Sequence, residues 1–226
     1  MATAIDIQVA PPDTQRISLR GISWQTYQRI AEELGDRRAV LLAYEGGILE
    51  LTMPGPLHED FKARLRRLVE TVTDELAIPC KGLGSTRWDR AAAFRGLESD
   101  ECYFLTAPKI EAARHRSADA ADYPTPDLAI EVDLRRSEVD RPEIYATLGV
   151  PEVWRFDGET LRIDHLRDDG TYEASATSQF LPIRPEEVAH WVLDVPAADD
   201  SAWVRQLRPW ARATLVPRPW PGGGDA

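Results

Sequence analysis

The chain is poor in lysine. Its lysines are Lys62, Lys81 and Lys109, so arginine supplies almost all of the 27 basic residues. These are outnumbered by 38 acidic residues, which gives a formal net charge of −11. A chain this acidic is not expected to coat nucleic acid through bulk charge, although a local basic patch stays compatible with it.

Long apolar runs and cysteine motifs are also missing. No run of about 18 apolar residues occurs, so no membrane span is expected. Residues 1–16 have neither a basic start nor a long apolar stretch, unlike a signal peptide. The two cysteines, Cys80 and Cys102, form no CxxC pair and suggest no disulfide framework. These absences predict a reduced, cytoplasmic protein.

The composition that remains is that of a globular domain. The chain has 226 residues, of which 43% are hydrophobic, enough for one sizeable core. We expect a disordered N-terminal segment over residues 1–16, one domain over 17–195, and a partly disordered tail over 196–226.

Local patterns predict a mixture of helices and strands. Apolar spacing predicts a helix up to Leu34 with Ser23 as N-cap, and a long amphipathic helix over residues 57–78. Gly46 and Gly47 separate two strands of a hairpin. Further strands, turns and helices are expected as follows: strands at 85–94 and 101–108 joined by a turn at 95–100, a short helix ending at Gly149, a β-meander with turns at 157–158 and 169–170, and a short helix at 184–192. The fold class is therefore α+β, a central sheet crossed by one long helix, with a C-terminal β-meander.

Acidic residues gather on one strand-like segment, "DLAIEVD". Alternate residues of a strand share a face, so Asp127, Glu131 and Asp133 point one way while the leucine, isoleucine and valine between them point into the core. Asp100 stands where another strand begins. Two carboxylates on neighbouring strands would suit Mg²⁺, which takes oxygen ligands and keeps several waters. The alternative is an ordinary strand whose polar face meets water.

Several stretches of the sequence, in order, resemble one family. They are "ISWQTYQRIAEELGDRR", "PGPLHEDF", "GLGSTRWDR", "GLESDECYFL", "PDLAIEV" and "EIYATLGVPEVWRFDG". The resemblance as a whole runs from about residue 22 to about residue 192. The chain resembles the Uma-two family of the PD-(D/E)XK nuclease superfamily. The resemblance implies a restriction-endonuclease-like mixed sheet flanked by helices, with Mg²⁺ (or Mn²⁺) as cofactor and DNA as substrate.

The resemblance also assigns roles to residues. Asp100 corresponds to the first metal-binding acid, Glu131 to the glutamate of the (D/E)XK element, and Asp127 to the "PD" before it. The lysine of this family stands four residues before the tyrosine of the "IY" pair. That tyrosine is Tyr145, and the lysine position holds Arg141.

Arginine at this position changes the chemistry that is expected. Arg141 can stabilise the negative charge of a transition state, but it cannot readily release a proton. A solvated helix residue is the equally weighted alternative. Accessory candidates are His58 and Glu59 at the start of the long helix, although a histidine there is more often structural. Lys62 and Arg66 are candidate nucleic-acid contacts, with a solvated helix face as the alternative.

Three functions fit these patterns. The first is a Mg²⁺-dependent endonuclease that hydrolyses DNA phosphodiester bonds. The second is a nuclease fold with a degraded site, which binds nucleic acid or a protein partner without cleaving. The third is an interaction domain that forms a homodimer through the meander or the tryptophan-rich tail.

Overall fold

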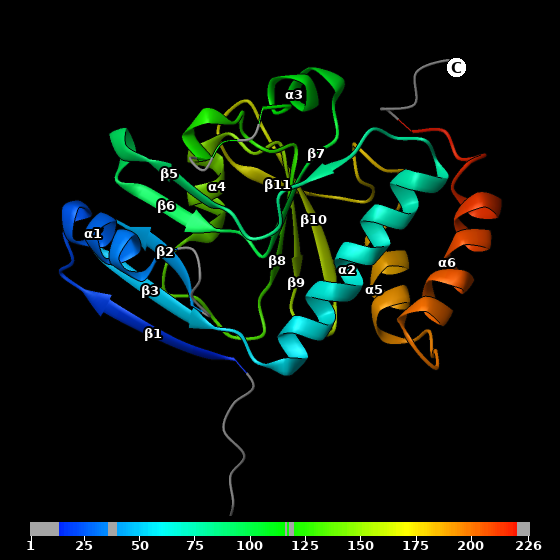
Figure 1. Ribbon diagram of the computed structural model, residues 1–226, viewed down its shortest axis with the longest axis horizontal. Coiled ribbons are helices and arrows are strands. Elements are labelled where there is room, and N and C mark those ends of the chain that lie inside the picture. The colour runs from blue at the N-terminus through cyan, green and yellow to red at the C-terminus, as the bar shows by residue number, and fades with distance from the viewer. Residues whose placement is uncertain (1–13, 36–39, 116, 118–119, 221–226) are drawn as a thin grey trace, which may run out of the picture.

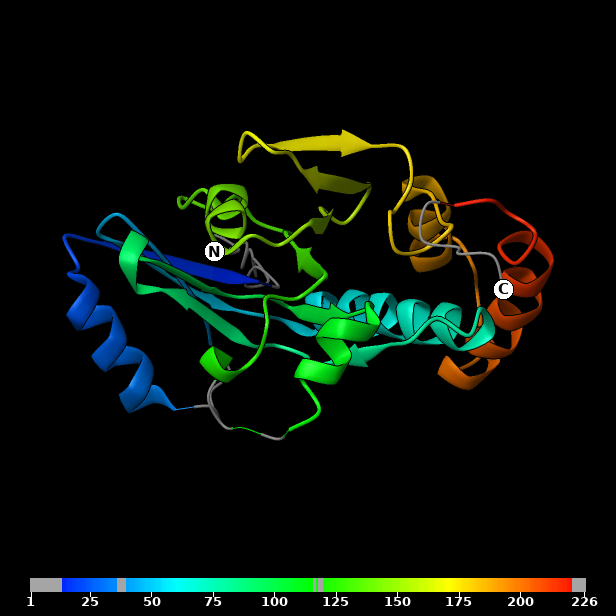
Figure 2. The same ribbon diagram turned by 90° about the horizontal axis from the view of Figure 1, so that it is seen from above.

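The elements form two β-sheets and the helices that cover them (Figures 1 and 2). The computed structural model describes residues 14–35, 40–115, 117 and 120–220. The mixed α+β class predicted from the sequence is confirmed. One central sheet was expected, and the strands instead divide between two sheets.

The first sheet is antiparallel and has the strand order β1-β3-β2-β6-β5. Its strands are β1 (Gln15–Arg20), β2 (Leu41–Glu45), β3 (Ile48–Met53), β5 (Arg87–Arg90) and β6 (Arg95–Glu98). The predicted hairpin is confirmed, since Gly46 and Gly47 adopt the positive φ values, 53° and 93°, that its tight turn requires. The expected turn at 95–100 is wrong in part. The chain reverses earlier, at η1 (Ala91–Ala93), and Arg95–Glu98 then pairs with both β2 and β5.

The second sheet is mixed and has the strand order β11-β10-β9-β8-β7-β4. Its strands are β4 (Lys81–Gly82), β7 (Glu101–Phe104), β8 (Leu128–Val132), β9 (Glu152–Phe156), β10 (Leu161–Leu166) and β11 (Tyr172–Ser175). The predicted meander is confirmed as β9, β10 and β11, which pair antiparallel. Strands β8 and β9 are parallel, and α4 (Arg141–Leu148) makes the crossover between them.

The predicted helices form where their caps and apolar spacing place them. They are α1 (Trp24–Leu34), α2 (Pro56–Glu75) and α5 (Pro185–Leu193). The polar insert between β7 and β8, for which no helix was predicted, forms α3 (Ala107–Ala112) and η2 (Ala120–Asp122). The Ser23 side chain accepts from the Thr26 amide and so caps α1, as predicted. Gly149 ends α4 in the left-handed conformation, with φ 76°.

Three apolar clusters set the order of the layers. Helix α1 packs on the outer face of the first sheet through Trp24 and Tyr27. Helices α2 and α5 cover the outer face of the second sheet, where Leu68 and Ile130 belong to one buried apolar cluster. The third cluster joins both sheets to α4 through Ala43, Ala129 and their neighbours. The charged residues considered next lie beside this third cluster.

The C-terminal region contains a helix that sequence analysis missed. The tail expected over 196–226 includes α6 (Asp200–Thr214), which packs along α2 (Figure 1). Trp203 and Leu207 are buried on its inner face, and their four-residue spacing was an available signal for the helix. Pro209 inside the helix obscures that signal. The predicted N-terminal segment falls mostly on residues 1–13, and part of the tail on 221–226, which lie outside the described residues.

None of the helices in the described ranges is both long and apolar enough to cross a lipid bilayer.

Candidate active site

Strands β7 and β8 bring Asp100 and Glu131 side by side. Glu101 pairs with Ile130 in the antiparallel ladder, so Asp100 lies opposite Glu131 one step further along. The Val132 amide donates to Asp100 Oδ2 at 2.8 Å, which orients that carboxylate. The two acids, distant in sequence, therefore lie on adjacent strands as the resemblance implied.

Both carboxylates are buried and do not line a solvent-open pocket. Asp100 and Glu131 are each 1% exposed. Ile130 and Val132 face the α2 core as predicted, but the opposite face of β8 is covered as well, by α4 and the first sheet. The alternative of a polar strand face in water is therefore wrong.

Arg141 is the counter-ion of Glu131. Its Nη1 donates to Glu131 Oε2 at 2.6 Å, and the Tyr145 hydroxyl donates to Glu131 Oε1. Residues four apart on a helix share a face, and this spacing explains why both reach one carboxylate. Arg141 is 3% exposed, which excludes the solvated helix residue that the sequence left open.

Glu50 is a member of this cluster that the sequence analysis missed. It comes from β3 of the other sheet, is fully buried, and its Oε1 lies 3.4 Å from Arg141 Nη2. Its carboxylate also accepts from Ser137 Oγ at 2.9 and 3.0 Å and from the Glu138 amide at 2.9 Å. Arg16 of β1 lies 3.4 Å from it. A lone acid among the alternating apolar residues of "ILELTMP" was the available signal.

Burial sets the protonation of the pair. Burial raises the pKa of Glu131 to about 8, and Asp100 acts in the same direction while Arg141 opposes it. Burial also acts against the charged form of Arg141, but Glu131 and then Asp133 outweigh it, so the pKa of Arg141 is raised. Arg141 therefore keeps its charge beside Glu131.

His58 extends the cluster towards α2. It is 1% exposed, and its Nε2 lies 3.3 Å from Asp100 Oδ1. Burial acts against the charged imidazole, but contact with Asp100 outweighs it and raises the pKa of His58. The carboxylate of Glu59 lies 3.5 Å from His58 Nδ1 with its side chain 53% exposed. Of the two accessory candidates, His58 is the one in direct contact with an acid of the site.

Asp127 lies at the other end of β8 and has a different set of partners. Its Oδ2 accepts from the amides of Leu105 and Thr106 and from Thr106 Oγ1, at 2.8, 2.9 and 2.8 Å. Its Oδ1 lies 2.8 Å from Lys109 Nζ. These contacts tie the start of β8 to the first turn of α3. The structure does not bring Asp127 together with Asp100 and Glu131.

Lys62 and Arg66, the predicted nucleic-acid contacts, differ in their surroundings. Lys62 lines a groove of about 1150 Å³ and donates to Ser85 Oγ at 3.0 Å. Ser85 in turn donates to the Asp100 carbonyl at 3.1 Å, so Lys62 is two hydrogen bonds from the site. Arg66 donates to Glu70 at 2.9 Å and lies 3.9 Å from Glu101, the residue after Asp100.

The donor set suits one hard divalent ion. Asp100 Oδ1 is buried and, apart from the contact with His58, no donor in the described part of the chain reaches it. Asp100 and Glu131 supply two carboxylates, the number that Mg²⁺ commonly takes from a protein. Within the described ranges, no cluster of three or more histidine, cysteine, aspartate or glutamate side chains is placed to hold a metal. An ion at this site would therefore complete its shell with water or substrate oxygens.

Comparison with known proteins places the chain in a family. No curated protein matches it. The model of the Uma2 family, described as putative restriction endonuclease, matches residues 24–196. That range contains both sheets except β1, and it contains every residue of the site described above except Arg16. Because the match covers well over half of the chain, the protein belongs to the Uma2 family of restriction-endonuclease-like proteins.

Proposed function

We propose that the protein is a Mg²⁺-dependent endonuclease that hydrolyses DNA phosphodiester bonds at Asp100 and Glu131. The observation that carries the proposal is the placement of these two buried carboxylates on adjacent strands, with Arg141 in contact with one of them. Families of this fold generally use a divalent metal ion, and Mn²⁺ is the natural substitute for Mg²⁺ at oxygen ligands.

Asp100 and Glu131 would hold the ion. When bound, it supplies a Lewis acid for the phosphodiester and lowers the pKa of the attacking water. The Val132 amide and His58 hold the Asp100 carboxylate in place. Tyr145 does the same for Glu131, because it donates to the oxygen that Arg141 does not contact.

Arg141 supplies positive charge where the family has lysine. Its guanidinium offers several N–H donors, which suit the extra negative charge that develops on the phosphate oxygens in the transition state. It keeps its proton, so it does not act as the base. Lys62 is proposed as a contact to the nucleic-acid backbone from the α2 side.

The test is nicking of supercoiled plasmid DNA. Wild-type protein is compared with Glu131→Gln and Asp100→Asn, each with Mg²⁺, with Mn²⁺ and with EDTA. The amides nearly keep the shape of the side chains and remove their charge. We expect metal-dependent nicking by the wild type alone, and equal nicking by Glu131→Gln would remove these acids from the mechanism.

One observation favours a second function, a nuclease fold that binds nucleic acid without cutting it. Both oxygens of Glu131 are engaged, one by Arg141 and one by Tyr145, and Arg141 also reaches Glu50. A guanidinium fixed between two acids neutralises charge that a metal ion would otherwise balance. DNA binding without nicking in either metal would select this function.

A further inference from the structure

A second hollow lies beside the site, on the loop between β8 and α4. It has a volume of about 450 Å³, and its lining includes Asp133, Arg135, Arg136, Arg141 and Arg155. Four arginines around one small hollow are unexpected in a chain with a net charge of −11.

This hollow lies next to the catalytic candidates. Arg155 of β9 is the register partner of Glu131 across the parallel ladder, and Asp133 follows Glu131 by two residues. Arg141, which lines the hollow, donates to Glu131 at 2.6 Å. A group that enters the hollow therefore meets the guanidinium that contacts the buried carboxylate.

The acids that line the hollow already have partners on this chain. Asp133 lies 3.4 Å from Arg16, and Glu138 lies 2.6 Å from Arg20. The Asp140 side chain accepts from the Glu143 amide and caps α4. Asp133 and Glu138 are thus paired with arginines of β1, and the Asp140 carboxylate serves as the helix cap.

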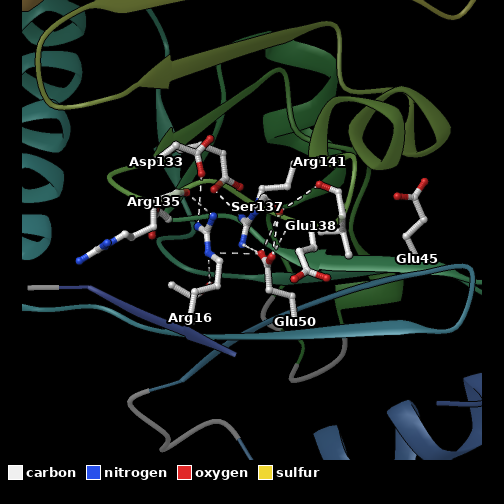
Figure 3. A network of polar contacts seen from close by, with 12 residues as sticks. Arg16, Glu45, Glu50, Asp133, Arg135, Ser137, Glu138 and Arg141 are labelled. Atoms are coloured by element: carbon white, nitrogen blue, oxygen red, sulfur yellow. Dashed lines mark hydrogen bonds and ion pairs between the residues drawn. The ribbon is translucent and has the colours of Figure 1, made fainter. Parts of the chain in front are cut away.

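Two of the four arginines that line the hollow lack an acidic partner among the described residues. Arg155 is held by Asp164 at 2.5 Å and Arg141 by Glu131, whereas Arg135 and Arg136 are exposed, and no acid within the described ranges forms an ion pair with either side chain. Figure 3 shows the Arg135 side chain extending away from the polar network. The hollow therefore presents two adjacent positive charges to solvent.

Arg141 adds an unsatisfied donor. Its Nε is buried and has no hydrogen-bond acceptor in the described part of the chain. A buried donor without an acceptor costs about 1–3 kcal/mol. An anionic oxygen bound in the hollow is the kind of acceptor that would remove this cost.

We propose that this hollow binds the phosphodiester backbone of the nucleic acid, with Arg135 and Arg136 as its contacts. The proposal rests on the proposed function, because it makes the loop the place where the strand to be cut enters. Guanidinium groups bind phosphate oxygens through paired N–H donors. This phosphate site differs from a contact between α2 and the nucleic-acid backbone, because Arg66 of α2 is already held by Glu70.

The test is binding of a short fluorescent DNA duplex, followed by anisotropy with EDTA present so that nothing is cut. The variants are Arg135→Ala/Arg136→Ala, the α2 variant Lys62→Ala/Arg66→Ala, and the matched control Arg29→Ala/Arg205→Ala, whose two arginines are exposed elsewhere. Circular dichroism melting checks that each protein folds. We expect folding to be kept, because Arg135 and Arg136 are exposed.

We expect the Arg135→Ala/Arg136→Ala protein to bind about tenfold or more weakly at low salt, and its log–log salt slope to fall by about 2, one for each lost phosphate contact. The Arg29→Ala/Arg205→Ala control should bind as the wild type does. Duplex DNA, single-stranded DNA and RNA competitors should lose affinity by similar factors, because all three present phosphates.

Three results would overturn the proposal. If the wild type nicks plasmid and Arg135→Ala/Arg136→Ala binds DNA as tightly as it does, the hollow is rejected as the phosphate site. The proposed function then stays in place. A wild type that neither binds nor nicks nucleic acid would reject both. A loss confined to one base sequence would also overturn it, since it would indicate base contacts instead of phosphate contacts.

Discussion

Arg141 Nη2 lies 3.4 Å from Glu50 Oε1, although the two residues are 91 positions apart and belong to different parts of the fold. Glu50 is on β3 of the first sheet, and Arg141 begins the helix that follows β8 of the second. Since Arg141 also contacts Glu131, one guanidinium ties the two sheets together at the candidate active site.

This relationship predicts a large loss of stability in Arg141→Ala. Removing the cation leaves Glu131 buried without a counter-ion and leaves Glu50 with Arg16 alone, which costs about 3–5 kcal/mol. Urea unfolding followed by tryptophan fluorescence measures the free energy of unfolding. The control is Arg29→Ala, whose surface ion pair spans 3.9 Å and should contribute at most about 0.5 kcal/mol. Equal effects of the two substitutions would show that Arg141 does not stabilise the fold.

Arg141→Lys should increase nicking. An ammonium is a compact charge that lacks the forked donors with which arginine reaches Glu131 and Glu50 together, so we expect it to leave Glu131 freer to bind metal. The measurement is plasmid nicking by Arg141→Lys and wild type in one Mg²⁺ buffer, with Glu131→Gln as the blank. Equal rates for lysine and arginine would mean that position 141 does not limit the reaction.

Metal binding should depend on Glu131 in a thermal-shift titration. An ion that binds the native state raises the midpoint of thermal unfolding, in proportion to the logarithm of its excess. Mg²⁺ or Mn²⁺ should therefore raise this midpoint for the wild type and not for Glu131→Gln. Glutamine keeps an acceptor for Arg141. With Arg141 buried against it, we expect Glu131→Ala to be destabilised.

The variant Asp127→Asn tests whether Asp127 is a metal ligand or a structural acid. Its carboxylate accepts three hydrogen bonds from Leu105 and Thr106, and loss of its charge should reduce stability by about 1–3 kcal/mol. If its role is structural, the Mg²⁺-induced rise in the midpoint should persist in this variant. A lost response with unchanged stability would instead restore Asp127 as a ligand.

Acid should weaken the attachment of α6. Hydrogen bonds from Arg212, and then from Arg208, lower the pKa of Glu75 below its ordinary value of 4.5. A lowered carboxyl pKa contributes stability that is complete above pH 4.5 and disappears as pH falls through the folded-state value. The difference in unfolding free energy between wild type and Glu75→Gln should therefore be present at neutral pH and shrink towards pH of about 3. A difference that does not change with pH would contradict this account.

The sequence by itself determined the local elements, because their signals lie within a few residues of one another. Ser23 caps α1, two glycines make the first hairpin, and strand alternation separates Glu131 from Ile130. The four-residue spacing of Arg141 and Tyr145 likewise predicted a shared face, and both side chains reach Glu131.

Tertiary structure alone decided which charges meet and how deeply they are buried. Glu50 and Arg141 become partners only because two sheets pack around α4, and no local pattern records a contact between segments so far apart. The same packing seals Asp100 and Glu131 from solvent, where strand periodicity left a water-facing side open. It also leaves Arg135 and Arg136 exposed beside them, since a loop that bends away from the core keeps its charges in water.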